Sequence, residues 1–228
     1  MIFDQYDRLR IVNLPRRADR RREMEAELAR FGGLAAHSDL AFFPALRPAH
    51  QAPFNCVGAH GCYLSHFRIL EQALADQASV LILEDDCRFL PGLTQFTQAG
   101  DTDIFYGGWQ QASNPADMLN SDIIGSHFMG FSRRVLNDLV PFLQKVLDPA
   151  ARFDPAIVRS DFNPAIRPPI DGAYIWFRRY YPEYKTQFAP LARQRASASD
   201  VADRSWFDQV PVVKELAGAA RRIRNRLA

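Results

Sequence analysis

The stretch SVLILEDD, at positions 79–86, decides the fold class of this 228-residue chain. The apolar run from Val80 to Leu83 is typical of a strand that is buried on both faces of a parallel sheet. The run ends abruptly in three acidic residues, Glu84, Asp85 and Asp86. Because ligands of open α/β sheets bind beyond the carboxyl ends of the strands, this stretch predicts a central strand with a site at its end.

Strands and helices alternate on the amino-terminal side of this stretch. The sequence LRIVNL at residues 9–14 predicts a short buried strand. Asp19 is a candidate N-cap for a helix that ends near Phe31. Apolar residues at helical spacing predict a further helix over residues 58–76.

The carboxyl-terminal side continues the pattern. Residues 102–106 predict a strand, residues 123–131 an interrupted strand, and residues 133–146 a helix in which Pro141 implies a kink or a break. The alternation predicts an α/β fold, with a Rossmann-type, mostly parallel sheet flanked by helices and an irregular C-terminal third.

Composition narrows the class of protein. The chain has 28 Lys and Arg against 26 Asp and Glu, a net charge of +2, and 47% of its residues are hydrophobic. This balance is typical of a folded globular domain and excludes extensive disorder. Because nucleic-acid binders usually carry a strong basic excess, we expect no nucleic-acid partner.

The charge is unevenly distributed along the chain. Residues 212–228 carry five basic side chains and one acidic side chain, a net of +4, which leaves −2 for the rest. We therefore predict one globular domain over residues 1–209, followed by a basic amphipathic helix over residues 210–228. That helix either lies on an anionic membrane surface or docks on the domain, and the sequence favours neither.

Location is predicted from absences in the sequence. No apolar run is long enough to span a membrane, the first residues lack a signal-peptide pattern, and three cysteines cannot all pair. We expect a cytoplasmic protein, held peripherally on the cytoplasmic face of the inner membrane if its C-terminal helix binds lipid.

The acidic cluster is the strongest sign of chemistry. Three adjacent carboxylates repel one another unless a cation lies among them. Mg²⁺ and Mn²⁺ prefer carboxylate oxygens together with substrate phosphates, so Glu84, Asp85 and Asp86 are candidates for a metal–diphosphate site. The alternative is a solvated turn or a helix cap.

Several motifs resemble glycosyltransferase family 25. The opening IVNLPRRADRR at positions 11–21, GCYLSH at 61–66 and LILEDD at 81–86 carry the resemblance. Weaker similarities follow in the expected order, in DIFYGG at 103–108, SRR at 132–134, PID at 169–171, Gln194 and SDV at 199–201. Ala59 and His60 depart from the family, which commonly has Glu after the first Gly of this segment.

The resemblance implies a single-domain, GT-A-like fold and an inverting transfer of a sugar. By resemblance, Glu84 and Asp86 hold Mn²⁺ or Mg²⁺, and the nucleotide sugar contacts Asn13, Leu14, Arg17, Arg20, Glu84, Asp85, Gln194 and Ser199. A general base must take the proton of the acceptor hydroxyl. We expect Asp171 in this role, with Asp200 as the second candidate, although Asp at a helix start is often only a cap.

Other polar residues near these motifs have plainer interpretations. Ser65 and His66 are adjacent on a predicted helix and point in different directions, so they form no catalytic pair. We expect His66 to line the site or to form a core hydrogen bond, and Cys62 to pack in the core. His127 could be a further metal ligand or contact the acceptor, but we expect a satisfied buried histidine.

The leading hypothesis is an inverting hexosyltransferase. It would move galactose from UDP-galactose onto a bacterial surface glycan, such as a lipid-linked lipopolysaccharide or lipooligosaccharide. The alternative is a catalytically degenerate protein that binds a nucleotide sugar or serves as a scaffold. A weaker alternative is a metal-dependent phosphohydrolase built on the acidic cluster.

Overall fold

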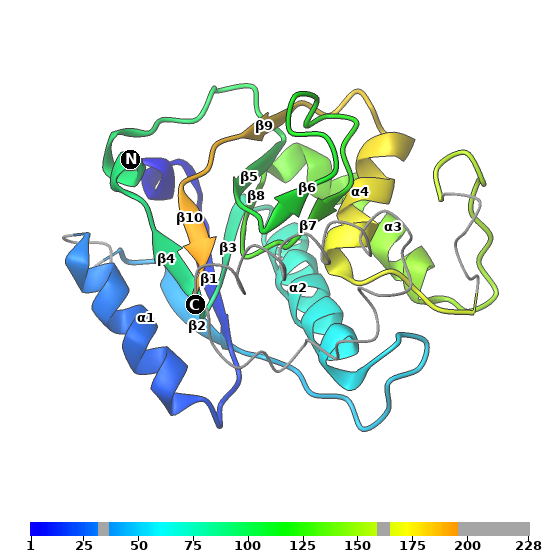
Figure 1. The fold of residues 1–228 in the computed structure, drawn as a ribbon, viewed down its shortest axis with the longest axis horizontal. Coiled ribbons are helices and arrows are strands. Elements are labelled where there is room, and N and C mark those ends of the chain that lie inside the picture. Colours follow the sequence, from blue (N-terminus) through cyan, green and yellow to red (C-terminus); the bar gives the residue numbers. More distant parts are fainter. Residues whose placement is uncertain (32–36, 159–164, 196–228) are drawn as a thin grey trace, which may run out of the picture.

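A computed structural model describes residues 1–31, 37–158 and 165–195 (Figure 1). The predicted domain boundary at residue 209 and the basic tail lie outside these residues, so both stay predictions. A six-stranded sheet forms the centre of the fold, in the order β2-β1-β3-β8-β5-β9. Its strands are β1 (Arg8–Asn13), β2 (Leu40–Pro44), β3 (Val80–Glu84), β5 (Ile104–Gly108), β8 (Phe128–Phe131) and β9 (Thr186–Phe188).

The sheet is mostly parallel. Strands β2, β1 and β3 pair in parallel, and so do β5 and β9. Strand β8 is the reversed member, because it pairs antiparallel with both β3 and β5. The predicted α/β class is confirmed, and the sheet with its flanking helices fits the GT-A-like fold that the motifs implied.

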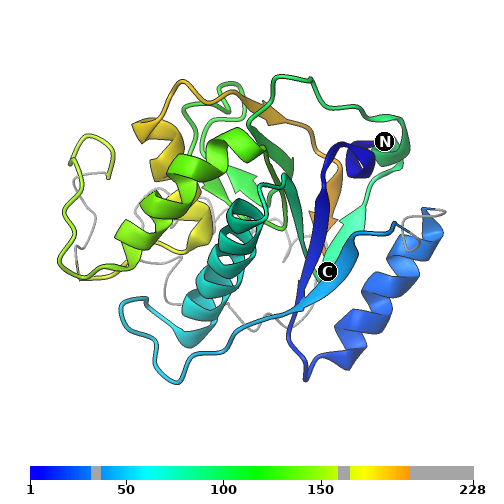
Figure 2. The same cartoon turned by 180° about the vertical axis from the view of Figure 1, so that it is seen from behind.

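Helices cover both faces of the sheet (Figures 1 and 2). One face packs against α2 (Val57–Ala75), α3 (Arg133–Leu147) and α4 (Ile170–Tyr180). The other packs against η1 (Ile2–Gln5), α1 (Ala18–Arg30) and η3 (Pro91–Gln95). Two small antiparallel pairs complete the structure: β4 (Cys87–Phe89) with β10 (Ala192–Gln194), and β6 (Gln111–Ala112) with β7 (Ile123–Ile124).

The apolar side chains of β3 pack on both faces of the sheet, as the continuous apolar run predicted. Val80 and Ile82 join the core under α2, α3 and α4, whereas Leu81 and Leu83 join the core under α1. All four side chains are fully buried. Burial of each of these side chains removes apolar surface from water, which stabilises the fold by about 25 cal/mol per Å² of apolar surface buried.

One local prediction was wrong. The N-cap of α1 is Arg17 rather than Asp19, because the Asp19 carboxylate forms an ion pair with Arg17. Pro141 lies inside α3 without ending it, because buried apolar residues on both sides hold the helix against the core, so the helix does not break there. The predicted interrupted strand over residues 123–131 consists of two strands, β7 and β8, which belong to different sheets.

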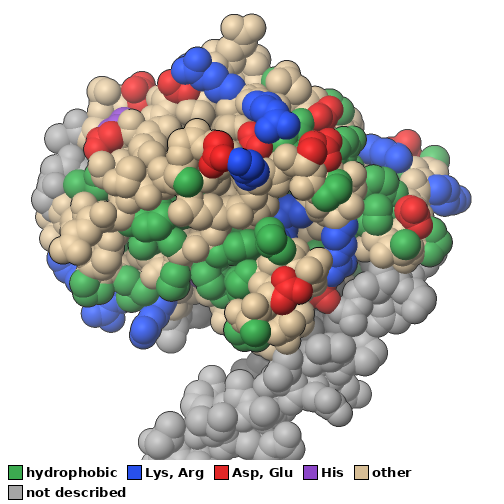
Figure 3. Space-filling model, turned by 90° about the horizontal axis from the view of Figure 1, so that it is seen from above, with side chains coloured by type: hydrophobic (Ala, Val, Ile, Leu, Met, Phe, Trp, Pro, Cys, Tyr) green, Lys and Arg blue, Asp and Glu red, His purple; other side chains and the backbone are tan. Residues whose placement is uncertain are grey.

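The amino ends of the strands are closed by ion pairs. Asp7, just before β1, accepts hydrogen bonds from the Ser79 amide at 2.7 Å and from Arg133 Nη2 at 2.6 Å. Asp103, just before β5, pairs with Arg134 Nη1 at 2.9 Å. Figure 3 looks down on this end of the molecule and shows acidic and basic side chains intermixed over it.

The described residues contain no helix that is both long and apolar enough to cross a membrane.

Candidate active site

The carboxyl ends of β1 and β3 bring together residues from distant parts of the chain. Asn13 ends β1, and its side-chain amide donates to Asp85 Oδ2 at 2.7 Å. Arg20, from the first turns of α1, lies between the two aspartates. Its Nη1 atom is 3.0 Å from Asp85 Oδ1 and 3.4 Å from Asp86 Oδ2.

Strand β10 closes this cluster from the other side. Gln194 Nε2 donates to Asp86 Oδ2 at 3.0 Å, and the Arg195 amide donates to the Asp86 carbonyl at 2.8 Å. The Arg195 guanidinium contacts the Asp85 carbonyl and lies 3.2 Å from Glu23 Oε2. Asn13, Arg20, Asp85, Asp86 and Gln194 were all predicted as site residues, and the structure gathers them.

Arg195 was missed at the sequence level. It lies one position beyond Gln194 and belongs to no motif, so only the pairing of β10 with β4 could place it. Its contacts add a second cation to the one that Arg20 supplies. The Arg195 guanidinium binds the Asp85 backbone carbonyl, and its charge acts to lower the pKa of Asp86.

Opposing influences act on the pKa values of the two aspartates. Burial raises the pKa of the Asp85 carboxyl, while Asn13 and Arg20 act to lower it. Burial also raises the pKa of Asp86, opposed by Gln194, Arg20 and Arg195. Within the described part of the chain, Asp86 Oδ1 is buried and has no hydrogen-bond partner, which leaves one oxygen available to a ligand.

Glu84 differs from its two neighbours. Its Oε1 atom lies 3.4 Å from Ser126 Oγ and 3.8 Å from His66 Nε2, and the described residues give it no arginine or lysine partner. Burial raises its pKa to about 8, and the charges of Asp86, Asp85 and Asp171 add to the shift. A cation beside the Glu84 carboxylate would stabilise its charged form and lower its pKa again.

Asp171 faces the same region from the first turn of α4. Its Oδ2 accepts from the Gly125 amide at 2.8 Å, and its Oδ1 accepts from the Gly172 amide at 2.9 Å. Gly125 has a φ of 95°, a conformation that glycine adopts without strain, and this turns its amide toward the carboxylate. Pro169 occupies the N-cap position of α4, so Asp171 is not its cap. Burial raises the pKa of Asp171.

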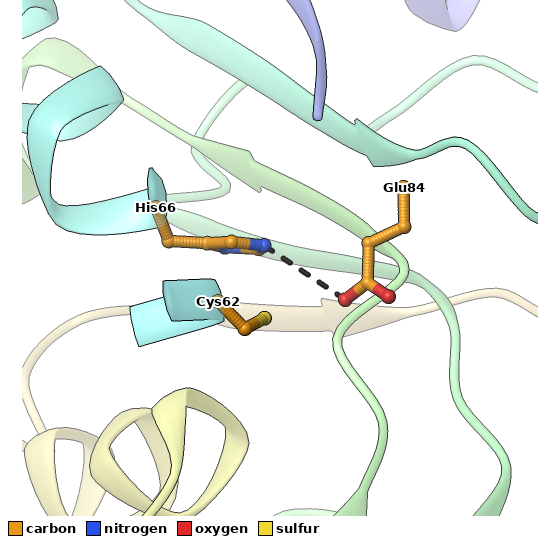
Figure 4. A group of neighbouring side chains, drawn as sticks. All are labelled: Cys62, His66 and Glu84. Carbon is orange, nitrogen blue, oxygen red and sulfur yellow. Dashed lines mark ion pairs between the residues drawn. The ribbon is translucent and has the colours of Figure 1, made fainter. Parts of the chain in front are cut away.

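His66 and Cys62 lie on the face of α2 that looks at Glu84 (Figure 4). His66 Nδ1 is 3.0 Å from the Tyr174 hydroxyl, and burial lowers the pKa of His66 to about 3. Ser65 faces elsewhere, because its hydroxyl donates to the Gly61 carbonyl at 2.7 Å. The prediction that Ser65 and His66 form no catalytic pair is confirmed.

His127 is buried, but its hydrogen bonds are not all satisfied as the plainer prediction required. Nε2 is 3.5 Å from the Ala192 carbonyl, Nδ1 has no hydrogen-bond partner among the described residues, and burial lowers the pKa of His127 to about 4. The group of potential metal ligands found among the described residues consists of Cys62, His66 and Glu84 and does not include His127.

Some predicted residues lie apart from the cluster or outside the described chain. Arg17 pairs with Asp19, and its carbonyl accepts from Asn13 Nδ2 at 3.3 Å. Leu14 is partly exposed just beyond the end of β1. Ser199 and Asp200 lie outside the described residues, so their assignments stay predictions.

These features define an α/β protein with a cluster of carboxylates at the carboxyl ends of β1 and β3. Comparison with known proteins narrows the class. A glycosyltransferase 25 family member of Aedes aegypti is 32% identical over 161 residues, which cover 57% of this chain and 26% of the relative. One of Drosophila melanogaster is 32% identical over 143 residues, which cover 48% and 22%.

Over about half of its length the chain is similar to these members of glycosyltransferase family 25, the family that its motifs resemble. The aligned part spans about a quarter of the length of the two relatives. No family model matches the chain.

Solved glycosyltransferases show a weaker likeness in structure. One, involved in the glycosylation of the major capsid of PBCV-1, has 10% identity and a TM-score of 0.46, over 92% of this chain and 99% of its own. The apo-form glycosyltransferase GlyE of Streptococcus pneumoniae TIGR4 has 10% identity and a TM-score of 0.44, over 93% and 63%.

Proposed function

We propose that this protein is a nucleotide-sugar-dependent glycosyltransferase whose donor binds at the carboxyl ends of β1 and β3. The observation that carries the proposal is the contrast among the three consecutive carboxylates. Arg20 pairs with Asp85 and Asp86, and Arg195 contacts the Asp85 backbone carbonyl, whereas Glu84 and Asp171 have no arginine or lysine partner among the described residues. A diphosphate and a cation together would complement both parts of this arrangement.

The donor set suits a hard divalent cation. Mg²⁺ and Mn²⁺ take oxygen ligands, and the buried Asp86 Oδ1 atom together with the Glu84 carboxylate offers such oxygens. Glu84 and Asp86 would hold the ion, and when bound it would offset the charge that develops on the leaving diphosphate. Arg20 and Asn13 keep the two aspartates fixed in orientation.

Asp171 has the surroundings of a general base for an inverting transfer. Two backbone amides fix its carboxylate, and burial raises its pKa toward the range in which a carboxylate accepts a proton readily. In the proposed step the acceptor oxygen attacks the anomeric carbon, the bond to the diphosphate breaks, and Asp171 takes the hydroxyl proton. Asp200 stays the second candidate for this role.

The finer assignments follow from the family resemblance. We propose galactose from UDP-galactose as the donor and a surface glycan, such as lipopolysaccharide or lipooligosaccharide, as the acceptor. A cytoplasmic location, with residues 210–228 on the inner membrane surface, would place the enzyme beside a lipid-linked acceptor.

Release of UDP tests the proposal. The full chain is incubated with UDP-sugars, Mn²⁺ and glycan acceptors. The control variant is Asp101→Asn, because Asp101 is exposed and its ion-pair partner is Lys185, away from β3. We expect acceptor-dependent release in the wild type and the control and a large loss in Asp171→Asn. Binding of UDP without turnover for any donor would favour the degenerate binding protein. Release that needs no acceptor would favour a phosphohydrolase.

A further inference from the structure

A second group of potential ligands lies behind Glu84, and its chemistry differs from that of the two aspartates. Cys62 and His66 are four positions apart on α2, so they project from the same face of the helix. One ligand atom from each of Cys62, His66 and Glu84 lies within 4.8 Å of the other two. Figure 4 shows the three side chains converging, with the imidazole edge and the carboxylate facing each other.

His66 is prepared to act as a ligand. Its side chain is fully buried, and Nε2 has no hydrogen-bond partner among the residues that the structure describes. The other ring nitrogen, Nδ1, is 3.0 Å from the Tyr174 hydroxyl. When Nδ1 carries the ring proton and donates it to that oxygen, the Nε2 lone pair points toward Glu84. Metal-binding histidines commonly fix their tautomer through such a second hydrogen bond.

The spacing suits a small tetrahedral ion. Ligand atoms around zinc lie roughly 2.0–2.3 Å from the metal, and hence roughly 3–4 Å from one another. The separation of 3.8 Å between His66 Nε2 and Glu84 Oε1 falls in this range. Burial raises the pKa of the Cys62 thiol, and the charges of Glu84, Asp171, Asp86 and Asp85 add to the shift, so a cation at this position would favour the thiolate.

The geometry points to a site for one thiophilic divalent cation, of the Zn²⁺ and Co²⁺ class, held by Cys62 Sγ, His66 Nε2 and a Glu84 oxygen. On binding, the thiol loses its proton to solvent and the sulfur donates as a thiolate. Three protein ligands leave a fourth position open, as in sites that bind water or a substrate oxygen. Mg²⁺, which prefers oxygen, would be a poor occupant. The inference does not depend on transferase activity.

Cobalt absorption tests the site without donor or acceptor. Metal-free full-length protein is titrated with Co²⁺, because a thiolate ligand gives an intense sulfur-to-cobalt charge-transfer band in the near ultraviolet. The control is Cys56→Ser: Cys56 is the N-cap of α2, where its sulfur accepts from the Ala59 amide, and serine also caps helices well.

We expect the band in the wild type and in Cys56→Ser, its loss in Cys62→Ser, and affinity at least about tenfold weaker in His66→Gln. Circular dichroism confirms that each variant is folded. Cobalt binding without the band, or a band that persists in Cys62→Ser, would overturn the assignment.

Discussion

The two ends of β1 and β3 treat their charged residues in opposite ways. At the amino end, Asp7 accepts hydrogen bonds from Ser79 and Arg133, and these hold its pKa well below the ordinary value. At the carboxyl end, burial and neighbouring carboxylates raise the pKa of Glu84 to about 8. The same strands thus end in a satisfied ion pair on one side and in an uncompensated carboxylate on the other.

This difference separates stability from function within one sheet. The amino end gains free energy from its charges, whereas the carboxyl end is less stable than it would be without them. Charged groups that cost folding free energy are typical of sites where a ligand supplies the missing partner. Four substitutions test this interpretation.

The largest effect is expected from Asp171→Asn. An amide cannot take the acceptor proton, so kcat should fall by about 10³-fold, while stability stays unchanged or rises because a buried charge is removed. The measurement is UDP release at saturating donor, with chemical denaturation of the same samples. Unchanged kcat would remove Asp171 from catalysis and favour Asp200.

Arg20→Met should destabilise the protein by about 3 kcal/mol, because it leaves Asp85 and Asp86 buried with less positive charge beside them. Urea unfolding measures this. Arg21→Met is the matched control, since Arg21 is exposed and pairs with Glu25 on the surface, where such pairs contribute little. Equal effects of the two substitutions would show that the aspartates do not depend on Arg20.

Glu84→Gln should stabilise the metal-free protein. The folded pKa of Glu84 is raised from 4.5 to about 8, so its stabilising contribution is complete below pH 4.5 and is lost as the pH rises through 8. The variant should gain about 2 kcal/mol over the wild type at pH 9 and little at pH 4, while losing transfer activity. A pH-independent difference in urea unfolding would contradict the raised pKa.

Asp7→Asn should have the smallest effect on stability, and it should destabilise the protein, opposite to Glu84→Gln. The folded pKa of Asp7 lies below its ordinary value of 3.8, so its contribution is present above that value and is lost as the pH falls further. Because the pair with Arg133 is partly exposed, we expect a loss of about 1 kcal/mol at pH 7. The difference from the wild type should shrink below pH 4 in the same unfolding assay, with transfer activity unchanged.

The sequence by itself determined the central strand and the acidic edge. The apolar run of β3 can be satisfied only by burial on two faces, and the ordered motifs predicted that Asn13, Arg20, Asp85, Asp86 and Gln194 would share one site. Local patterns of this kind report which side of an element is buried and where it ends. They could not show that α3 continues through Pro141, or that the two parts of the interrupted strand belong to different sheets, because packing and pairing with distant strands decide both.

Only the tertiary structure decided how the three consecutive carboxylates differ. Asp85 and Asp86 turn toward Arg20, Gln194 and Arg195, whereas Glu84 turns toward His66 and Ser126. Glu84 is the last residue of β3, whereas Asp85 and Asp86 form the turn that follows it, and the partners of each come from helices and strands far away in the sequence. The sequence determines which side chains can carry a charge, but the pKa and the partners of each depend on the residues that the fold places beside it.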